Sequence, residues 1–234
     1  MRAEEHWREE AHRWAAWTRA PGHDAYWHYR DRFFELVPTP GRATLEIGCG
    51  EGRVSRDLAA RGHTVTGVDI TPALVELAVE ADPGSAYLVG DAEVLPFPDA
   101  SFDLAVAYNS LMDVDDMPAA VSEAARVLEP GGRLCACITH PLMDAGSFEG
   151  ERFVIEESYL AKRSFEGTFE RDGLELTFRG WCYPLEAYSH ALEDAGFLIE
   201  AIREPEPGAD APAALDHHAR IPIFLMFRAL KPAV

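Results

Sequence analysis

The stretch Glu46-Ile47-Gly48-Cys49-Gly50-Glu51-Gly52 decides the fold class of this chain. It follows the short apolar run Ala43-Thr44-Leu45 and precedes a helical pattern that starts at Arg53. Glycines at alternate positions let the backbone turn tightly and leave no Cβ between the chain and a ligand. A glycine-rich turn between a strand and a helix N-terminus is typical of a nucleotide-cofactor loop. A dinucleotide fingerprint needs a small residue one place later, where this chain has Arg53.

Strand and helix patterns alternate after this loop. The expected strands cover 43–47, 64–68, 86–89, 104–107, 133–139, 197–202 and 223–230. The expected helices cover 53–61, 71–81, 118–128 and 185–195. Such alternation predicts right-handed crossovers and a mostly parallel, Rossmann-like α/β sheet of about seven strands with helices on both faces.

Two segments depart from this pattern. Residues 1–40 are rich in aromatics, are broken by Pro21-Gly22, and predict a helical cap or lid. Residues 41–234 then form one Rossmann-like domain, with an insertion of extended structure at about 142–183. Within the insertion, Arg171-Asp172-Gly173 predicts a hairpin turn. We expect this insertion, which follows the fifth strand, to cover the ligand edge of the sheet.

The composition narrows the function classes. A formal net charge of −19 disfavours nucleic acid and anionic membrane surfaces as partners. The N-terminus lacks the apolar core of a signal peptide, so we expect a cytoplasmic protein. The four cysteines form no C-x-x-C pair, which favours buried thiols over a metal site, and we expect no metal.

Four elements in order resemble the class I S-adenosylmethionine-dependent methyltransferases, and most closely the type 11 group of small-molecule enzymes. They are the Glu46–Gly52 loop, Asp69 at the end of the second strand, Gly90-Asp91-Ala92-Glu93, and the run 125–134 with Pro130-Gly131-Gly132. The resemblance implies an enzyme that binds S-adenosyl-L-methionine, releases S-adenosyl-L-homocysteine and moves a methyl group to a small-molecule acceptor by in-line displacement.

The resemblance also implies the residues that bind the cofactor. Asp69 would accept hydrogen bonds from the ribose diol, Asp91 would meet the adenine amino group, and Ile70 would pack on the ring. The alternative for both aspartates is a plain turn residue. The implied set is Glu46, Gly48, Cys49, Gly50, Gly52, Asp69, Ile70, Asp91, Ala92, Asn109 and Ser110.

Candidates for other roles are fewer. His140 follows the fifth strand and would serve as a base, or would be a His-Pro turn residue. Tyr108 is a second catalytic candidate. Asn109-Ser110-Leu111 after it departs from the N-P-P-Y type motif of amino- and DNA-methylating relatives, so the sequence does not support their substrates. Tyr26 and Arg30 lie four apart on one helical face, so they would close over the cofactor carboxylate or belong to a helix packed on the domain.

Asp113, Asp115 and Asp116 precede Pro118 at a helix start, so capping and helix-dipole compensation account for them.

Two other functions compete with methyl transfer. One is a protein that binds the cofactor on the same fold without methylating, because a fold does not settle chemistry. The other is a nicotinamide-dependent oxidoreductase, which Arg53 and the later motifs disfavour. The sequence leaves open the acceptor, the atom methylated, the need for a base, and whether the protein is a monomer or a homodimer.

Overall fold

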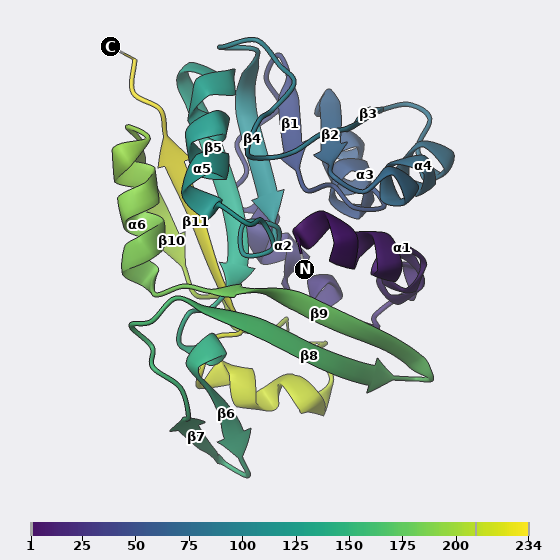
Figure 1. The fold of residues 1–234 in the computed structure, drawn as a ribbon, viewed down its shortest axis with the longest axis vertical. Coiled ribbons are helices and arrows are strands. Elements are labelled where there is room, and N and C mark those ends of the chain that lie inside the picture. Colours follow the sequence, from purple (N-terminus) through teal and green to yellow (C-terminus); the bar gives the residue numbers. More distant parts are fainter. Residues whose placement is uncertain (1, 209, 234) are drawn as a thin grey trace.

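The computed structural model describes residues 2–208 and 210–233. Its centre is a seven-stranded sheet in the order β10-β11-β5-β4-β1-β2-β3, in which β11 runs antiparallel to both of its neighbours (Figure 1). The strands are β1 Thr44–Ile47, β2 Val65–Asp69, β3 Ala86–Val89, β4 Phe102–Tyr108, β5 Leu128–Thr139, β10 Leu198–Arg203 and β11 Phe224–Leu230. The predicted Rossmann-like, mostly parallel sheet is confirmed.

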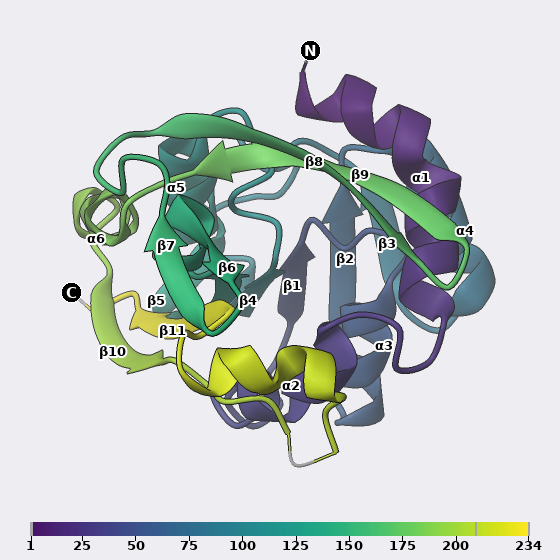
Figure 2. The same cartoon turned by 90° about the horizontal axis from the view of Figure 1, so that it is seen from below.

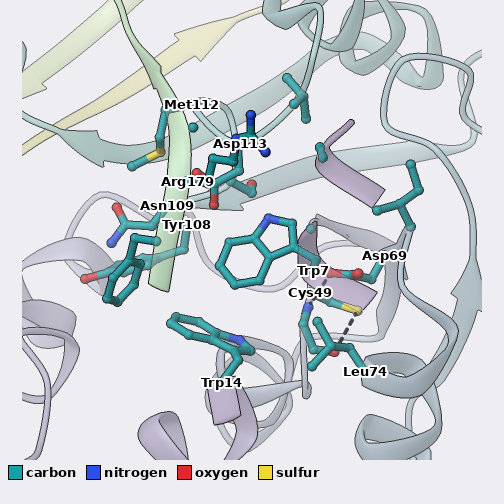
Figure 3. A pocket seen from close by; sticks show the side chains of 18 of the residues that line it. Trp7, Trp14, Cys49, Asp69, Leu74, Tyr108, Asn109, Met112, Asp113 and Arg179 are labelled. Atoms are coloured by element: carbon teal, nitrogen blue, oxygen red, sulfur yellow. Dashed lines mark hydrogen bonds between the residues drawn. The ribbon is translucent and has the colours of Figure 1, made fainter. Parts of the chain in front are cut away.

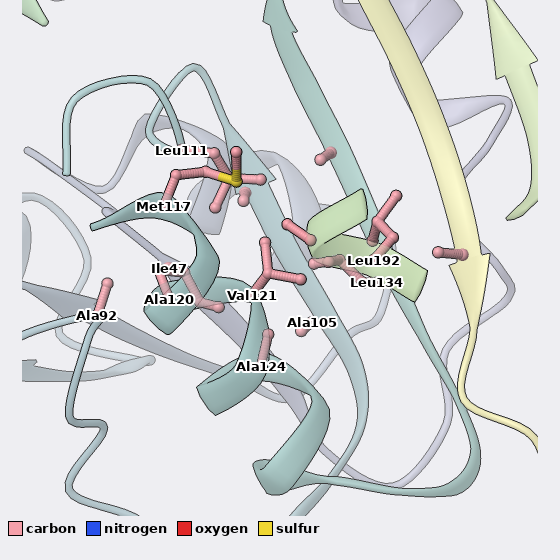
Figure 4. Packing of buried hydrophobic residues seen from close by; sticks show 14 of the residues in the cluster. Ile47, Ala92, Ala105, Leu111, Met117, Ala120, Val121, Ala124, Leu134 and Leu192 are labelled. Carbon is pink, nitrogen blue, oxygen red and sulfur yellow. The ribbon is translucent and has the colours of Figure 1, made fainter. Parts of the chain in front are cut away.

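Helices cover both faces of the sheet. They are α1 Ala3–Arg19, α2 Tyr26–Phe34, α3 Arg53–Ala60, α4 Pro72–Ala81, α5 Met117–Val127 and α6 Leu185–Asp194, with short 3₁₀ turns at η1 Met143–Ala145 and η2 Ala213–Ala219. On one face α5 and α6 pack on the sheet through Val121, Ala124 and Leu192 (Figure 4). On the other face α2 and α3 pack through Phe33 and Leu58.

Strand residues divide between these two cores because side chains alternate across a sheet. In β1, Leu45 and Ile47 join the α5–α6 core. In β5, Cys135 and Cys137 join the α2–α3 core, so the two thiols share one face as their spacing predicts. All four cysteines are buried.

The boundary of β5 differs from the sequence prediction. The strand begins at Leu128, before the Pro130-Gly131-Gly132 run that the sequence pattern marks as a turn. Phe102 pairs with Leu128, whereas Leu104 pairs with Arg133, so the glycine run forms an irregularity inside the strand pairing. Extra residues accommodated in this way let one strand continue through a turn-like sequence.

The insertion forms two hairpins outside the main sheet. They are β6 Gly146–Glu149 with β7 Arg152–Ile155, and β8 Arg163–Arg171 with β9 Leu174–Cys182. The predicted turn is present, since Asp172 and Gly173 have φ values of 53° and 78° and link β8 to β9. The long hairpin crosses the end of the sheet at which β4 terminates, with α1 beside it (Figures 1 and 2).

Among the described residues, no helix is long and apolar enough to cross a membrane.

Candidate active site

A cavity of about 830 Å³ lies at the carboxyl ends of the parallel strands, where α1 and the β8–β9 hairpin cover them (Figure 3). Both cap and insertion contribute to its wall, through Trp14 and Phe178 for example. The lining brings together most of the residues that the sequence nominated for the cofactor. They are Tyr26, Glu46, Gly48, Cys49, Gly50, Asp69, Ile70, Asp91, Ala92, Asn109 and Ser110. The nominated residues Gly52, Arg30 and His140 do not line the cavity.

The glycine loop is fastened to the end of β2. The backbone amides of Gly48 and Cys49 both donate to the carbonyl of Val68, at 2.8 and 3.0 Å. The Gly50 amide donates to Asp69 Oδ2 at 2.8 Å, and the Thr71 amide donates to Asp69 Oδ1 at 2.9 Å. Two backbone donors thus fix the Asp69 carboxylate at the cavity wall, and each oxygen keeps capacity to accept a further hydrogen bond.

Burial raises the pKa of Asp69, whereas the hydrogen bonds from Thr71 and Gly50 oppose that shift. Those donors favour the carboxylate form, which is the form that accepts from two hydroxyl groups.

The chain after β1 and the chain after β4 approach each other closely, which explains why position 48 is a glycine. Gly48 has φ +70°, and a Cβ at that position would lie 2.4 Å from the Cβ of Ser110. The Ser110 hydroxyl donates to the Ile47 carbonyl at 2.7 Å and ties the two strand ends together. Next to it, Asn109 adopts φ 51° and its buried Oδ1 has no hydrogen-bond partner among the described residues. That unpaired oxygen at the cavity wall is suited to a ligand donor.

Glu46 lies behind the glycine loop. Its carboxyl accepts a hydrogen bond from the Ser55 hydroxyl of α3, and it is buried. Burial raises the pKa of Glu46 to about 8, although the Ser55 hydrogen bond opposes the shift. The contact with α3 makes Glu46 a support of the loop as well as part of the cavity wall.

Gly52 has a packing role rather than a place in the cavity. It precedes α3 with φ +83°, and a Cβ there would lie 2.9 Å from the Tyr87 hydroxyl and 3.1 Å from the Cβ of Ala78. Because Gly52 has no side chain, α3 can begin close to β3 and α4.

The loops after β2 and β3 form the far end of the cavity. Ile70 follows Asp69, and Asp91 with Ala92 follows β3. The Glu93 amide donates to Asp91 Oδ1 at 2.9 Å, which fixes that side chain in a local turn. An apolar surface beside a fixed carboxylate suits a planar base with an exocyclic amino group.

The N-terminal cap is bound to the glycine loop by aromatic and ionic contacts. A Cβ on Gly50 would lie 3.0 Å from Trp14 Nε1, so the indole rests directly on the loop. Buried Glu51 accepts from Arg19 of α1 and from Arg56 of α3, at 2.9 and 2.8 Å. These contacts close the cavity on the side of α1.

Tyr26 and Arg30 share one partner. The Tyr26 hydroxyl donates to Asp57 at 2.5 Å, and Arg30 donates to the same carboxylate at 3.3 Å. Both therefore attach α2 to α3. Arg53 of α3 does line the cavity, lies over the Tyr26 ring at 4.0 Å and pairs with Asp24 at 2.8 Å. In the sequence, Arg53 stands out only as a departure from the dinucleotide pattern.

The two nominated bases occupy different surroundings. His140 accepts from the Leu142 amide at its Nδ1, at 3.0 Å, and its Nε2 lies 2.8 Å from Glu204. Both ring nitrogens are engaged in holding the chain after β5. Tyr108 does line the cavity, but burial raises the pKa of its hydroxyl well above the usual value, so the phenol stays protonated at neutral pH.

Asp113 and Asp144 are among the carboxyl groups of the cavity that were not recognised from sequence as part of a site. Asp113 follows β4, and Asp144 follows β5 within η1. Capping, the role expected for the acidic cluster, belongs to Asp116, which accepts from the Ala119 amide at 3.1 Å. The capping prediction is therefore correct for Asp116, whereas it missed the position of Asp113 in the cavity wall.

The residues present fit S-adenosylmethionine. The glycine loop leaves room where Cβ atoms would clash, Asp69 offers acceptors at the end of β2, and Asn109 offers an unpaired oxygen. A volume near 830 Å³ is in the upper part of the range of about 300–1,000 Å³ for small-molecule sites. It leaves space for a cofactor and a small acceptor together.

Comparison with known proteins identifies the class. Residues 45–136 match the family Methyltransf_11, described as "Methyltransferase domain". The chain is 32% identical over 180 residues to a demethylmenaquinone methyltransferase of Tropheryma whipplei, a match that spans 74% of this chain and 73% of that protein.

Another relative is the malonyl-[acyl-carrier protein] O-methyltransferase of Serratia marcescens. It is 37% identical over 121 residues, or 49% of this chain and 48% of that protein, so the chain spans about half the length of this relative. A solved S-adenosylmethionine-dependent methyltransferase from Mesorhizobium loti superposes with a TM-score of 0.71 at 26% identity, covering 88% of this chain and 98% of that one.

The chain belongs to the S-adenosylmethionine-dependent methyltransferases. It is a transferase of their small-molecule branch, and S-adenosylmethionine is its cofactor.

Proposed function

We propose that the glycine loop, Asp69 and the loop after β3 hold S-adenosylmethionine, and that the cavity over the ends of β4 and β5 takes a small acceptor. One observation carries this proposal. A single cavity reaches from Gly50 and Asp69, past Asn109, to Trp181 of the inserted hairpin. A cofactor and an acceptor would thus share one enclosed space.

The methyl group comes from the cofactor's sulfonium, which loses its positive charge as the acceptor attacks. The chain's own contribution is position and enclosure, because an in-line displacement gains most from aligned reactants and excluded water. Asp69 would accept from the ribose hydroxyls and so fix the cofactor's orientation. Trp14 and the β8–β9 hairpin would exclude water from the reacting atoms.

Within the cofactor half of the cavity, Asp91 and Ile70 would orient the base, and the amides beyond the glycine loop would favour the amino-acid carboxylate. Tyr26 and Arg30 would support the site indirectly, because their hydrogen bonds to Asp57 hold α2 against α3.

Calorimetric titration with S-adenosylmethionine, S-adenosylhomocysteine and NAD tests the cofactor assignment. We expect micromolar binding of the first two, and at least a tenfold loss in Asp69→Asn, which keeps the shape of the side chain and removes its charge and one acceptor. Asp194→Asn, in the last turn of α6, is the matched control and should bind like the unaltered protein. Binding of NAD alone, or equal affinity in both variants, would contradict the proposal.

A further inference from the structure

Asp113 and Asp144 line the cavity on the side of β4 and β5. The residues nominated for the cofactor are mostly on β1, β2 and β3 or follow them, whereas Asp113 follows β4 and Asp144 follows β5. In the sheet order, β4 and β5 come next to β1 on the side away from β2. The two carboxyl groups therefore lie toward the β4–β5 side of the cavity, the side that the proposed function gives to the acceptor.

The β8–β9 hairpin holds Asp113 in place. The Trp181 amide donates to the Met112 carbonyl at 2.8 Å. A Cβ on Gly180 would lie 2.8 Å from Asp113 Oδ1, so the carboxyl rests against the bare backbone of β9. Any side chain at position 180 would collide with the Asp113 carboxyl, so glycine is required there. Figure 3 shows Asp113 among the side chains that line the cavity.

Neither carboxyl group is neutralised within the part of the chain that the structure describes. No hydrogen bond or ion pair of these residues reaches the side chain of Asp113 or Asp144, and the nearby Arg179 lies 3.6 Å from Glu166. Burial raises the pKa of Asp113 well above its usual value, and the charges of Asp69 and Asp144 raise it further. Burial also raises the pKa of Asp144 to about 7, and only Arg163 opposes that shift.

Apart from Arg163, the titratable groups next to Asp144 carry no positive charge. Cys182 and Tyr188 both lie close enough to Asp144 for its charge to raise their pKa values. Asp113 and Asp144 are half-buried. Half-buried carboxyl groups without a hydrogen bond or ion pair are costly to ionise, and a cation brought beside them favours the charged form. The pair is thus a site that gains most from a positively charged ligand.

Aromatic rings line the same cavity. Rings from α1 and from the inserted hairpin line the cavity, and the ring faces of such side chains attract cations. They include Trp7, Trp14, Phe165, Phe169, Phe178 and Trp181. Lys162 already lies over the Trp181 ring at 4.4 Å, so this ring accepts a cation on one of its faces.

We propose that the methyl acceptor is a small primary or secondary amine, bound as its ammonium ion by Asp113 and Asp144 among these rings. This inference rests on the proposed function, since it names the acceptor class of the same cavity. One carboxylate takes a proton from the ammonium group: an N–H bond breaks and an O–H bond forms. The freed nitrogen lone pair then forms the C–N bond as the C–S bond breaks. The electron pair of the C–S bond stays on sulfur.

Calorimetry on the full chain saturated with S-adenosylhomocysteine tests the inference. The probes are a set of primary amines, from propylamine to 2-phenylethylamine, each paired with the alcohol of the same skeleton. We expect at least one amine to bind tenfold or more tightly than its alcohol. In Asp113→Asn/Asp144→Asn this ratio should fall to near one. The amine's affinity should also weaken from pH 8 to pH 5.5 in the unaltered protein and stay constant in the double variant.

Binding of S-adenosylhomocysteine to the double variant separates the two proposals. Undiminished binding shows a folded cofactor site, and an unchanged amine-to-alcohol ratio would then overturn the amine inference alone. Alcohols that bind as tightly as their amines, or no amine that binds at millimolar concentration, would overturn it too. If the unaltered protein does not bind S-adenosylhomocysteine, the proposed function is contradicted instead. Asp194→Asn is again the control.

Discussion

Gly48 combines two constraints that can be separated by substitution. Its φ of +70° favours glycine, and a Cβ would overlap Ser110. Gly131 has φ +86° with nothing within 4 Å of its added Cβ, so it shares the first constraint and lacks the second. A left-handed conformation costs a non-glycine residue about 1–2 kcal/mol.

We therefore expect Gly131→Ala to lower the free energy of unfolding by about 1–2 kcal/mol. Gly48→Ala should cost at least about 1 kcal/mol more, because strand ends must shift to relieve overlap. It should also abolish S-adenosylhomocysteine binding, while Gly131→Ala retains it. Urea unfolding and calorimetry measure the two effects. Equal losses in both variants would show that overlap with Ser110 is relieved without displacing the loop.

Glu46 makes stability depend on pH. Its folded-state pKa of about 8 exceeds the ordinary value of 4.5. Between these values the folded protein holds a proton that the unfolded chain releases, so the free energy of unfolding falls as pH rises through this window. A tenfold difference in proton affinity between the folded and unfolded states corresponds to about 1.4 kcal/mol, so the loss by pH 8 is on the order of a few kcal/mol.

Glu46→Gln imitates the protonated side chain and removes this dependence. We expect its melting temperature to exceed that of the unaltered protein at pH 8 and to match it at pH 5. Thermal unfolding across that range measures the difference. Glu186→Gln on exposed α6 is the control and should follow the unaltered profile. Parallel curves for Glu46→Gln and the unaltered protein would mean that Glu46 is ionised in the fold.

Helix α1 depends on the domain beneath it. Its aromatic residues rest on β9 and the glycine loop, as the contacts of Trp14 and Trp17 with Phe178 and of Trp14 with Gly50 show. Arg19 adds a polar attachment at its C-terminal end, donating to Glu51 at 2.9 Å and to the Leu77 carbonyl of α4 at 3.0 Å. In proteins most helical stability comes from the packing of an amphipathic face, so these contacts decide the order of α1.

Arg19→Met should loosen this helix without disturbing the sheet. We expect hydrogen exchange at residues 3–19 to quicken by roughly a factor of ten, the change expected from the loss of about 1.4 kcal/mol of local stability, while β1 and β4 are unaffected. Arg32→Met, which removes an exposed pair with Glu35 on α2, is the control. Exchange of α1 that is unchanged in Arg19→Met would assign its order to the aromatic contacts alone.

The local elements were predictable to different degrees. The β8–β9 turn followed from Arg171-Asp172-Gly173, because few residues adopt positive φ and their order marks the turn. The start of β5 was placed too late, because Pro130-Gly131-Gly132 resembles a turn. In the fold, Gly131 and Gly132 exchange backbone hydrogen bonds with Lys231, just after β11, and these keep the run in the strand. Turn chemistry is local, whereas strand continuity depends on a neighbour.

The whole molecule brings together residues that are far apart in the chain. Trp14, Asp69, Asp113 and Trp181 meet in one cavity because α1 and the inserted hairpin both cross the carboxyl ends of the parallel strands. The chain has a formal net charge of −19, and the lining of this cavity also has more acidic than basic side chains. The sign of that charge is what makes a cationic acceptor the better fit.

The sequence by itself determined the sheet, the glycine loop and the acid at the end of β2. These features follow from hydrophobic periodicity and from motifs whose residues are close together in the chain. Only the tertiary structure decided the rest: Asp57 as the partner of Tyr26 and Arg30, the orientation of His140 toward Glu204, and the place of Asp113 in the cavity wall. Each of these depends on which side chain a distant element presents, and one-dimensional spacing does not carry that information.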